Sequence, residues 1–217
     1  MTDHYFSDDP AAPATRRRIT VPIAGRDTEV VTAAGVFSHD GLDLGTRVLL
    51  RETPPPPVSG DLLDLGCGWG PLALTLARLA PGARVWAVDV NPRAVELTAE
   101  NALLLGLGGI TALAPDEVPA DLRFDMIWSN PPIRVGKATL HELMMQWLPR
   151  LATGGEAYLV VQRNLGADTL HRWLLGNLPG RQFDVARHGS AKGYRVIRVR
   201  RKSSPSSVGE TAVTRRS

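Results

Sequence analysis

The sequence predicts a doubly wound α/β fold, in which helices cover both faces of a mostly parallel sheet. Short apolar runs alternate with longer helical patterns along most of the 217 residues. Connections that contain a whole helix favour parallel strand pairing through right-handed crossovers. With 43% hydrophobic and 22% charged residues, the composition is typical of one soluble globular domain. Ligands of such a fold bind beyond the carboxyl ends of the strands.

The expected elements begin with a hairpin over residues 19–24 and 28–32, followed by a helix over 46–52 that Thr46 would cap. The remaining expected elements are strands over 61–65, 84–90, 110–113, 124–129 and 156–162, helices over 71–79, 92–107, 138–151 and 167–178, and a final hairpin over 183–187 and 194–200. This last hairpin adds an antiparallel strand to a Rossmann-like sheet. Pro54 to Pro57 form an extended spacer before the first sheet strand.

The two ends differ in composition from the middle of the chain. Residues 1–18 are polar and contain proline, which predicts a flexible arm, and residues 202–217 predict a disordered basic tail. The folded domain is therefore expected over 19–201. No apolar run approaches the ~20 residues of a membrane span, and the start lacks the pattern of a signal peptide. We expect a cytoplasmic protein without membrane contact.

A glycine-rich loop follows the strand expected over 61–65. The run Asp64-Leu65-Gly66-Cys67-Gly68-Trp69-Gly70 leads directly into a helix that starts at Pro71. Glycines are needed where a strand turns sharply and a ligand approaches the backbone. The next strand ends in Val88-Asp89-Val90-Asn91, and a carboxylate there can accept hydrogen bonds from both hydroxyls of a ribose. The two patterns together predict a nucleoside cofactor, against the alternative of an ordinary strand–helix turn.

The choice of cofactor depends on spacing and charge. The glycines follow Gly-x-Gly-x-Gly, whereas the dinucleotide pattern is Gly-x-Gly-x-x-Gly. Asp64 would repel a pyrophosphate but attract the ammonium group of a methionine. S-adenosylmethionine is therefore preferred over NAD. The expected cofactor contacts are Asp64, Gly66, Cys67, Gly68, Gly70, Asp89 and Val90.

Two further features bear on ligands. Asp116, after the third strand, can accept a hydrogen bond from the adenine amine, although a solvent-facing acid in a loop is equally consistent with this position. The five histidines and the single cysteine, Cys67, show no metal-ligand spacing, so no metal is predicted. Cys67 is expected to be a buried filler. The net charge of +3 permits a nucleic-acid partner without requiring one.

The fourth strand ends in Ser129-Asn130-Pro131-Pro132-Ile133. A strand cannot continue through two prolines, and the residue before a proline is held extended. The side chain of Asn130 and the carbonyl of Pro131 are thereby presented as fixed acceptors at the edge of the sheet. Two acceptors that hold both hydrogens of an amine orient its lone pair for methyl transfer. A simple strand-ending turn is the alternative reading of this motif.

These motifs resemble the small-domain methyltransferase family, close to the branch of ribosomal small-subunit RNA guanine-N2 methyltransferases. The matching stretches are His4-Tyr5-Phe6-Ser7, Gly35-Val36-Phe37-Ser38, Leu42-Asp43-Leu44-Gly45-Thr46, Asp64 to Gly70, Val88 to Asn91, Ser129 to Ile133 with Gly136-Lys137, Gly166-Ala167 and Gly193-Tyr194-Arg195-Val196. The resemblance implies that Phe37 and Ser38 border the cofactor and target pocket, and that Asn130 holds the target amine. It implies small-subunit ribosomal RNA as the partner and N2 of guanine as the acceptor.

One departure and several alternatives accompany this resemblance. Many relatives have an aromatic residue after the two prolines, where this chain has Ile133, so stacking on the base would fall to Phe37 or another ring. Arg134 and Lys137 are expected either to hold target phosphates or to lie in a solvated loop. The same chemistry on adenine N6, protein glutamine or a small molecule, and a non-catalytic RNA-binding factor, are the competing functions. The sequence carries no signal for an oligomeric state.

Overall fold

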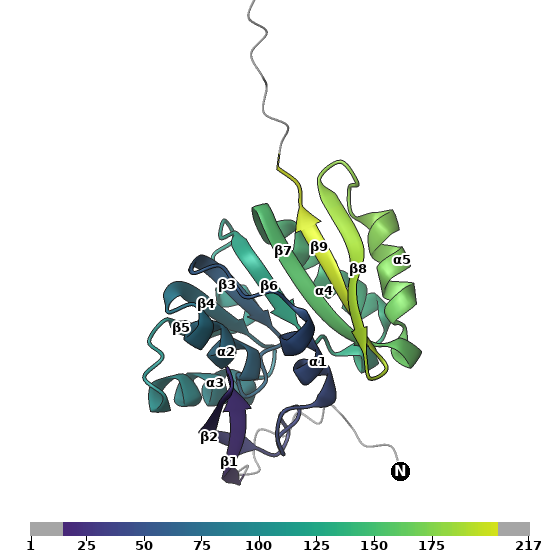
Figure 1. Cartoon of the computed structure of the whole chain (residues 1–217). Helices are drawn as coiled ribbons and strands as arrows, with labels where there is room; N and C mark the ends of the chain where they lie inside the picture. Colours follow the sequence, from purple (N-terminus) through teal and green to yellow (C-terminus); the bar gives the residue numbers. More distant parts are fainter. Residues whose placement is uncertain (1–14, 204–217) are drawn as a thin grey trace, which may run out of the picture.

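The structure, a computed structural model, describes residues 15–203. Residues 1–14 of the expected arm over 1–18, and residues 204–217 of the expected tail over 202–217, lie outside the described residues. Figure 1 shows a hairpin of β1 (Arg16–Ile23) and β2 (Arg26–Ala33) beside one large twisted sheet. In the described part of the chain, no helix has the length and apolar character that would let it cross a membrane.

The large sheet has seven strands, and all but one of them run parallel. Their spatial order is β5 (Ile110–Leu113), β4 (Gly82–Val88), β3 (Ser59–Leu65), β6 (Phe124–Ser129), β7 (Leu151–Gln162), β9 (Tyr194–Arg201) and β8 (Phe183–Ala191). Along the chain, β3, β4 and β5 are added in one direction, and β6 and β7 are then added on the other side of β3. The point between β3 and β6 is therefore the topological switch where α/β folds bind ligands.

The one antiparallel strand, β9, fits between β7 and β8. Its first residue, Tyr194, pairs with Gln162 at the end of β7. Because β9 runs opposite to its neighbours, its beginning lies at the carboxyl edge of the parallel strands. The final hairpin thus brings Tyr194 to the edge where the ligand is expected.

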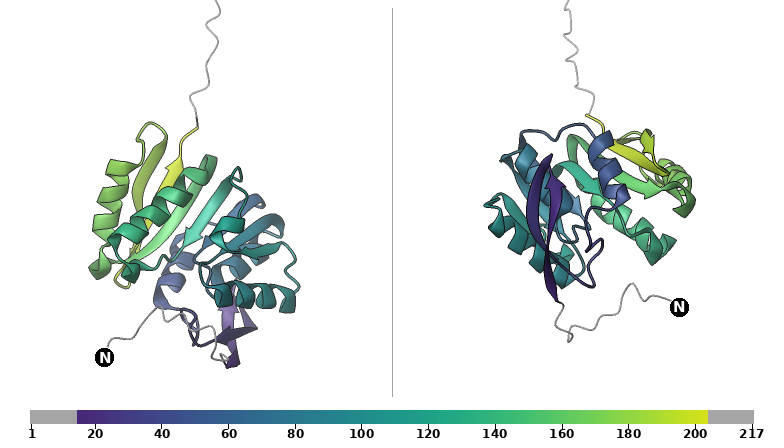
Figure 2. Two further views of the ribbon diagram at one scale, coloured as in Figure 1. Left: turned by 180° about the vertical axis from the view of Figure 1, so that it is seen from behind. Right: turned by 60° about the horizontal axis from the view of Figure 1, so that its bottom comes forward.

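Helices cover both faces of the sheet, as predicted. Helices α1 (Leu44–Glu52) and α2 (Pro71–Leu79) pack on one face through a hydrophobic cluster that includes Leu62, here called the α1–α2 cluster. Helices α4 (Lys137–Trp147) and α5 (Ala167–Asn177) cover the other face, seen from behind in Figure 2. Their cluster, the α4–α5 cluster, includes Leu63. Neighbouring residues of one strand therefore contribute to opposite cores, as a buried parallel strand requires.

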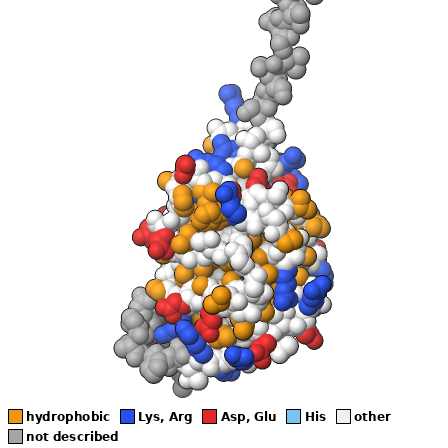
Figure 3. Space-filling model, turned by 90° about the vertical axis from the view of Figure 1, so that its left-hand side faces the viewer, with side chains coloured by type: hydrophobic (Ala, Val, Ile, Leu, Met, Phe, Trp, Pro, Cys, Tyr) orange, Lys and Arg blue, Asp and Glu red, His pale blue; other side chains and the backbone are white. Residues whose placement is uncertain are grey.

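The hairpin β1–β2 packs against helix α3 (Pro92–Leu104) rather than joining the sheet. The buried amide of Asn101 in α3 accepts a hydrogen bond from the backbone N–H of Val31 at 2.6 Å and donates to its carbonyl at 2.8 Å. It also donates to the carbonyl of Trp69 at 2.9 Å. This one side chain ties the hairpin to the glycine loop. On the end of the molecule that carries β5, charged side chains of both signs are interspersed with hydrophobic ones (Figure 3).

The start of the first helix differs from the prediction. Helix α1 begins at Leu44, and its N-cap is Asp43, whose carboxylate accepts hydrogen bonds from the backbone N–H groups of Gly45 and Thr46. The predicted cap, Thr46, lies inside the helix, and its hydroxyl donates to Asp43. Threonine was favoured because it precedes an apolar run. An aspartate is at least as good a cap, and it lies three residues earlier.

Other helices and strands also begin or end at residues that differ from those predicted. The helix expected over 138–151 ends at Trp147, where a 3-10 turn, Leu148–Arg150, includes Pro149, and β7 already starts at Leu151. The strand β1 includes three arginines that were expected in the arm, and Arg18 pairs there with Glu29. The last turn is tighter than expected, because only Lys192 and Gly193 lie between β8 and β9, with φ of 48° and 81°.

Candidate active site

The glycine loop connects β3 to α2 at the switch point of the sheet. Gly66, Gly68 and Gly70 all have positive φ, at 79°, 58° and 95°, which only glycine adopts without strain. A Cβ on Gly66 would meet no atom within 4 Å, so the backbone there borders open space. At Gly70 a Cβ would lie 3.0 Å from the hydroxyl of Thr98. The first glycine therefore leaves room for a ligand, and the third allows close packing.

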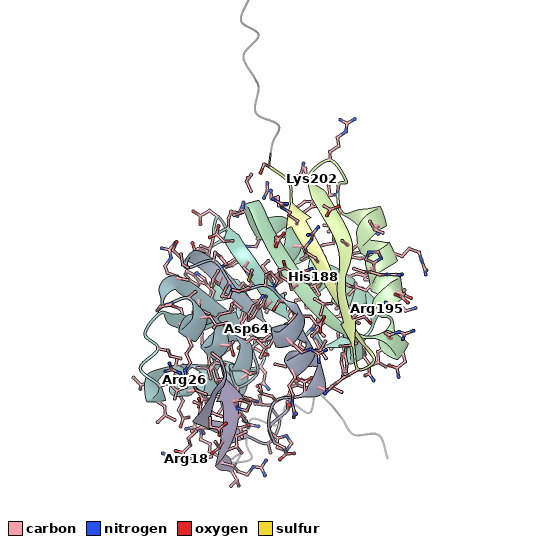
Figure 4. All side chains as sticks on the ribbon, in the orientation of Figure 1. Arg18, Arg26, Asp64, His188, Arg195 and Lys202 are labelled. Atoms are coloured by element: carbon pink, nitrogen blue, oxygen red, sulfur yellow. The ribbon has the colours of Figure 1, made fainter. Side chains whose placement is uncertain are left out.

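Asp64 lies below this loop and is fully buried near the middle of the sheet (Figure 4). One carboxylate oxygen, Oδ2, accepts a hydrogen bond from the backbone N–H of Ala73 at 2.8 Å. The other, Oδ1, has no hydrogen-bond partner within the described part of the chain. Burial raises the pKa of Asp64 to about 8. A buried acceptor without a donor is costly, so this atom is suited to a donor that a ligand brings.

Asp89 follows the end of β4, beside the loop. Its two oxygens accept hydrogen bonds from the backbone N–H groups of Gly68 and Asn91, each at 2.9 Å. Burial raises the pKa of this carboxyl. Val90, next to it, is 67% exposed, and Asp116 lies exposed in a short turn after β5, the strand beside β4. All three residues follow the carboxyl ends of neighbouring strands.

A loop over residues 35–38 covers the glycine loop. The indole N–H of buried Trp69 donates to the carbonyl of Ser38 at 3.1 Å. Ser38 has a positive φ of 57°, and its hydroxyl donates to the carbonyl of Gly41 at 2.6 Å. Phe37 is half exposed, and its carbonyl lies near Gly68. The hydroxyl of Ser38 shapes its own loop, while the ring of Phe37 borders the pocket described below.

Asn130 follows β6, directly beside the end of β3, where the hydroxyl of Ser129 donates to the carbonyl of Leu65 at 2.7 Å. The Nδ2 of Asn130 lies 3.2 and 3.1 Å from the two carboxylate oxygens of Asp43, and 3.3 Å from the hydroxyl of Thr46. A carboxylate only accepts hydrogen bonds, so the NH₂ of the amide must face Asp43. The Oδ1 acceptor of Asn130 is thereby turned the other way.

One pocket unites the two halves of the predicted site. It is lined by Phe37, Ser38, Gly41, Leu42, Asp43, Thr46, Asp64, Gly66, Cys67, Gly68, Pro71, Leu72 and Asn130. Asp89, Val90 and Asp116 lie outside this pocket, along the edge of the sheet. Cys67 is buried, and burial raises the pKa of its thiol well above the usual value, so it fills space rather than acting as a nucleophile.

The residues after Asn130 separate in space. Pro131 is buried and Pro132 is exposed. Ile133 is partly buried and packs against the α4–α5 cluster. Lys137 is exposed at the first position of α4, and the side chain of Arg134 lies outside the described residues. The predicted target contacts at these two positions therefore stay predictions.

Sequence reasoning assigned no active-site role to Asp43 or Thr46, although both lie in a stretch that carried the family resemblance. The signal was available, because an aspartate before a helix is a strong N-cap candidate. Their approach to Asn130, 84 and 87 residues away, depends on the fold. Among the described residues, no group of three His, Cys, Asp or Glu side chains is placed to hold a metal ion.

The strand order, with a glycine loop after the first strand and Asn-Pro-Pro after the strand beside it, defines the class as a Rossmann-like methyltransferase fold. The model of the methyltransferase small domain matches residues 27–197, and the chain belongs to that family. The predicted fold class and the predicted cofactor, S-adenosylmethionine, are thus confirmed.

Three relatives illustrate the similarity. The uncharacterised protein YbxB of Bacillus subtilis is 31% identical over 204 residues, which cover 93% of this chain and 100% of that protein. Ribosomal RNA small subunit methyltransferase C of Pseudomonas entomophila is 35% identical over 85% of this chain and 54% of its own length. A solved structure of the Thermus thermophilus 16S rRNA N2 G1207 methyltransferase (RsmC), in complex with AdoMet and guanosine, has a TM-score of 0.72 and 28% identity. It matches 89% of this chain and 52% of that chain, so the present chain spans about half of these RNA methyltransferases.

Proposed function

We propose that this protein transfers a methyl group from S-adenosylmethionine to an exocyclic amine, the N2 of a guanine in small-subunit ribosomal RNA. The observation that carries the proposal is the fixed amide of Asn130. Asn130 lines the same pocket as Asp64 and Gly66, so the amine that receives the methyl group would meet the methyl donor there. The cytoplasm is the expected compartment.

The residues around the glycine loop suit the cofactor. The unpartnered Oδ1 of Asp64 would accept a hydrogen bond from the methionine ammonium, and the open space at Gly66 would admit the chain of the methionine. The remaining lone pairs of Asp89 would accept the ribose hydroxyls. Val90 and Asp116 would border the adenine. When bound, the cofactor supplies a methyl group that its positively charged sulfur activates for transfer.

Asn130 would orient the target nitrogen. The lone pair of an aromatic amine is delocalised into its ring, so the amine must be held with this lone pair toward the methyl group. The Oδ1 of Asn130 and the carbonyl of Pro131 are two acceptors for the two amine hydrogens. Both hydrogen bonds strengthen as positive charge develops on the nitrogen, which is when they stabilise the transition state most.

The Asp43 carboxylate would act as the positioning group for this amide. Without it, rotation of the Asn130 side chain by half a turn would present NH₂ to the amine and repel it. The two hydrogen bonds to Asp43 and the contact to Thr46 hold one orientation. Methylation makes the nitrogen acidic enough to release its proton to water, so no protein base is required. Much of the rate gain would then come from placing the two reactants in contact.

The choice of guanine in ribosomal RNA rests on similarity. Several relatives are named as small-subunit ribosomal RNA methyltransferases, and the solved one is in complex with AdoMet and guanosine. Lys137, exposed at the start of α4, and Arg134 would contact phosphates of the target strand. Adenine, protein glutamine and small-molecule amines are the other targets that the same chemistry serves.

Methyl transfer to ribosomal RNA tests the proposal directly. Small subunits and naked 16S rRNA from a strain without the protein would be incubated with the enzyme and isotopically labelled S-adenosylmethionine. Nucleosides would then be separated and weighed by mass spectrometry. We expect one new N2-methylguanosine in wild-type reactions and none with Asn130→Ala. Label in N6-methyladenosine, or none in RNA, would contradict the guanine assignment.

A further inference from the structure

The residue after the two prolines, Ile133, has no ring. Ile133, after the two prolines, is partly buried against the α4–α5 cluster, and an aliphatic side chain cannot stack on a nucleobase as a ring does. A flat base whose amine is held by Asn130 still exposes two faces. A ring from another part of the fold could contact one of them.

Tyr194 lies in the right place for this contact. It is the first residue of β9, at the carboxyl edge, and its partly buried ring packs against the α1–α2 cluster. The backbone N–H of Arg163 donates to the carbonyl of Gly193 at 2.8 Å, which fixes the turn just before the ring. The next side chain, Arg195 (Figure 4), contacts Asp168 of α5 at 2.8 Å. Because neighbouring strand residues face opposite sides, this pairing leaves Tyr194 on the α1 side.

Gly45 shows how close the ring comes to the catalytic amide. A Cβ on Gly45 would lie 3.0 Å from the ring carbon Cε1 of Tyr194, 3.0 Å from Oδ1 of Asp43 and 3.3 Å from Nδ2 of Asn130. Three groups from three distant segments therefore converge over one glycine. Glycine in a helix costs about 1 kcal/mol relative to alanine. The close approach of these groups explains its presence in the first turn of α1.

The ring of Tyr194 approaches this cluster but does not line the pocket of the glycine loop. Asp43 and Asn130 line the pocket that contains the glycine loop, whereas Tyr194 lies outside it. The other ring at the edge, Phe37, lines the pocket itself. Tyr194 therefore lies beside the groups that hold Asn130 without being part of the pocket that contains the glycine loop. Burial, together with the charge of Asp43, raises the pKa of the phenol, so its hydroxyl stays protonated and available as a donor.

We propose that Tyr194 is the aromatic contact for the target base, packing its ring on the nucleobase whose amine Asn130 holds. The inference rests on the proposed function in that it requires a nucleobase as substrate. It adds the residue that selects a flat, aromatic target over an aliphatic amide. The hairpin β8–β9 thereby becomes part of the substrate site, in place of the residue after the prolines.

Nucleoside binding tests this contact without the rest of the RNA. Guanosine and adenosine would be titrated calorimetrically into the protein saturated with S-adenosylhomocysteine. Stacking on an aromatic side chain contributes enough that Tyr194→Ala should weaken guanosine binding by roughly 5- to 100-fold. Tyr194→Phe keeps the ring and should stay within about twofold of wild type. Tyr194→Leu keeps apolar volume without the ring and should resemble Tyr194→Ala.

Controls separate the ring from a general effect on the fold. Tyr158 belongs to the same cluster but is 1% exposed, so Tyr158→Phe should leave guanosine binding unchanged. Affinity for S-adenosylhomocysteine should be the same in all variants. If Tyr194→Ala and Tyr194→Leu bind guanosine as tightly as wild type does, the ring contact alone would be overturned. A wild-type protein that binds neither nucleoside would overturn the contact and the guanine assignment together, and preference for adenosine would overturn only the latter.

Discussion

The candidate active site has a cofactor side and a target side, both at the carboxyl edge of the sheet, and they are built in different ways. On the cofactor side, the run from Asp64 to Gly70 supplies the buried carboxylate and the three positive-φ glycines, and Asp89 follows on the next strand. On the target side, Asp43, Asn130 and Tyr194 come from a helix cap, a strand end and a hairpin. The cofactor side is local in sequence, whereas the target side exists only after folding. Substitutions should separate the two sides by their effects on cofactor affinity and on turnover.

The largest effect is expected at the centre of the target side. Asn130→Ala removes the acceptor proposed to orient the amine, and kcat should fall by about 10²–10³-fold or more, as for loss of a donor or acceptor that acts in the transition state. Affinity for S-adenosylhomocysteine, measured by calorimetry, should stay within about twofold. Equal losses of turnover and cofactor affinity would show that the two sides are not separable.

Asp43→Asn should be next in size. The substituted amide can present NH₂ toward Asn130, so the catalytic amide loses its fixed orientation, and kcat should fall by about 10- to 100-fold. The helix cap is largely kept, because asparagine caps as well as aspartate. Thermal unfolding should therefore change little. A variant with full turnover would mean that Asn130 holds its orientation without the carboxylate.

Asp64→Asn tests the cofactor side. Asparagine still accepts from the N–H of Ala73 but places an NH₂ where the ammonium would bind, so affinity for S-adenosylhomocysteine should fall about tenfold. In wild type the carboxyl ionises with a pKa of about 8. Cofactor affinity should therefore tighten between pH 6 and 8 in wild type and stay flat in the variant. The opposite pH dependence in wild type would argue against an Asp64–ammonium pair.

Asp64→Asn should also change how the stability of the protein depends on pH. A carboxyl with a pKa of 3.8 when unfolded and about 8 when folded binds more protons in the folded state between these values. The free energy of unfolding of the cofactor-free protein should thus fall as pH rises through this range. Asp64→Asn lacks this loss, so its melting temperature relative to wild type should rise from pH 5 to pH 8. Scanning calorimetry at the two values measures the difference.

The smallest effect is expected at Trp69. Trp69→Phe removes the indole donor to the carbonyl of Ser38 but keeps a buried ring. A neutral hydrogen bond contributes about 1 kcal/mol, so cofactor affinity should weaken by about fivefold or less, with kcat unchanged. A drop in kcat alone would place the 35–38 loop on the target side instead.

The cofactor side, whose residues are close together in the sequence, was the part that the sequence predicted well. The helix starting at Pro71, the strand over 124–129 and the turn between β3 and α2 have their expected bounds, because proline and glycine punctuate them strongly. Periodicity also indicated the doubly wound sheet and its antiparallel strand. Phe37, Ser38, Asp64, Gly66, Gly68 and Asn130 meet in one pocket, as expected from strand ends that share one edge.

The remainder depended on contacts between distant residues. Asp43 was passed over for Thr46 because either residue can cap a helix, and only the fold shows that Asp43 also holds Asn130. The early start of β7 follows from Leu151, which pairs with Phe124 of β6 ahead of a register shift. Neither contact leaves a periodic signal. The place of Ile133 against a core could not be read from its neighbours for the same reason.

The insertion of β9 between β7 and β8 has a consequence for biogenesis. A chain that has emerged from the ribosome only through β8 has every residue of the glycine loop and the Asn-Pro-Pro motif, yet its sheet still has a gap between two strands. Domains generally fold as units, so the sheet is complete only once β9 has been synthesised. The last strand to be synthesised is therefore an interior one, and it brings Tyr194 to the edge of the sheet that holds Asn130.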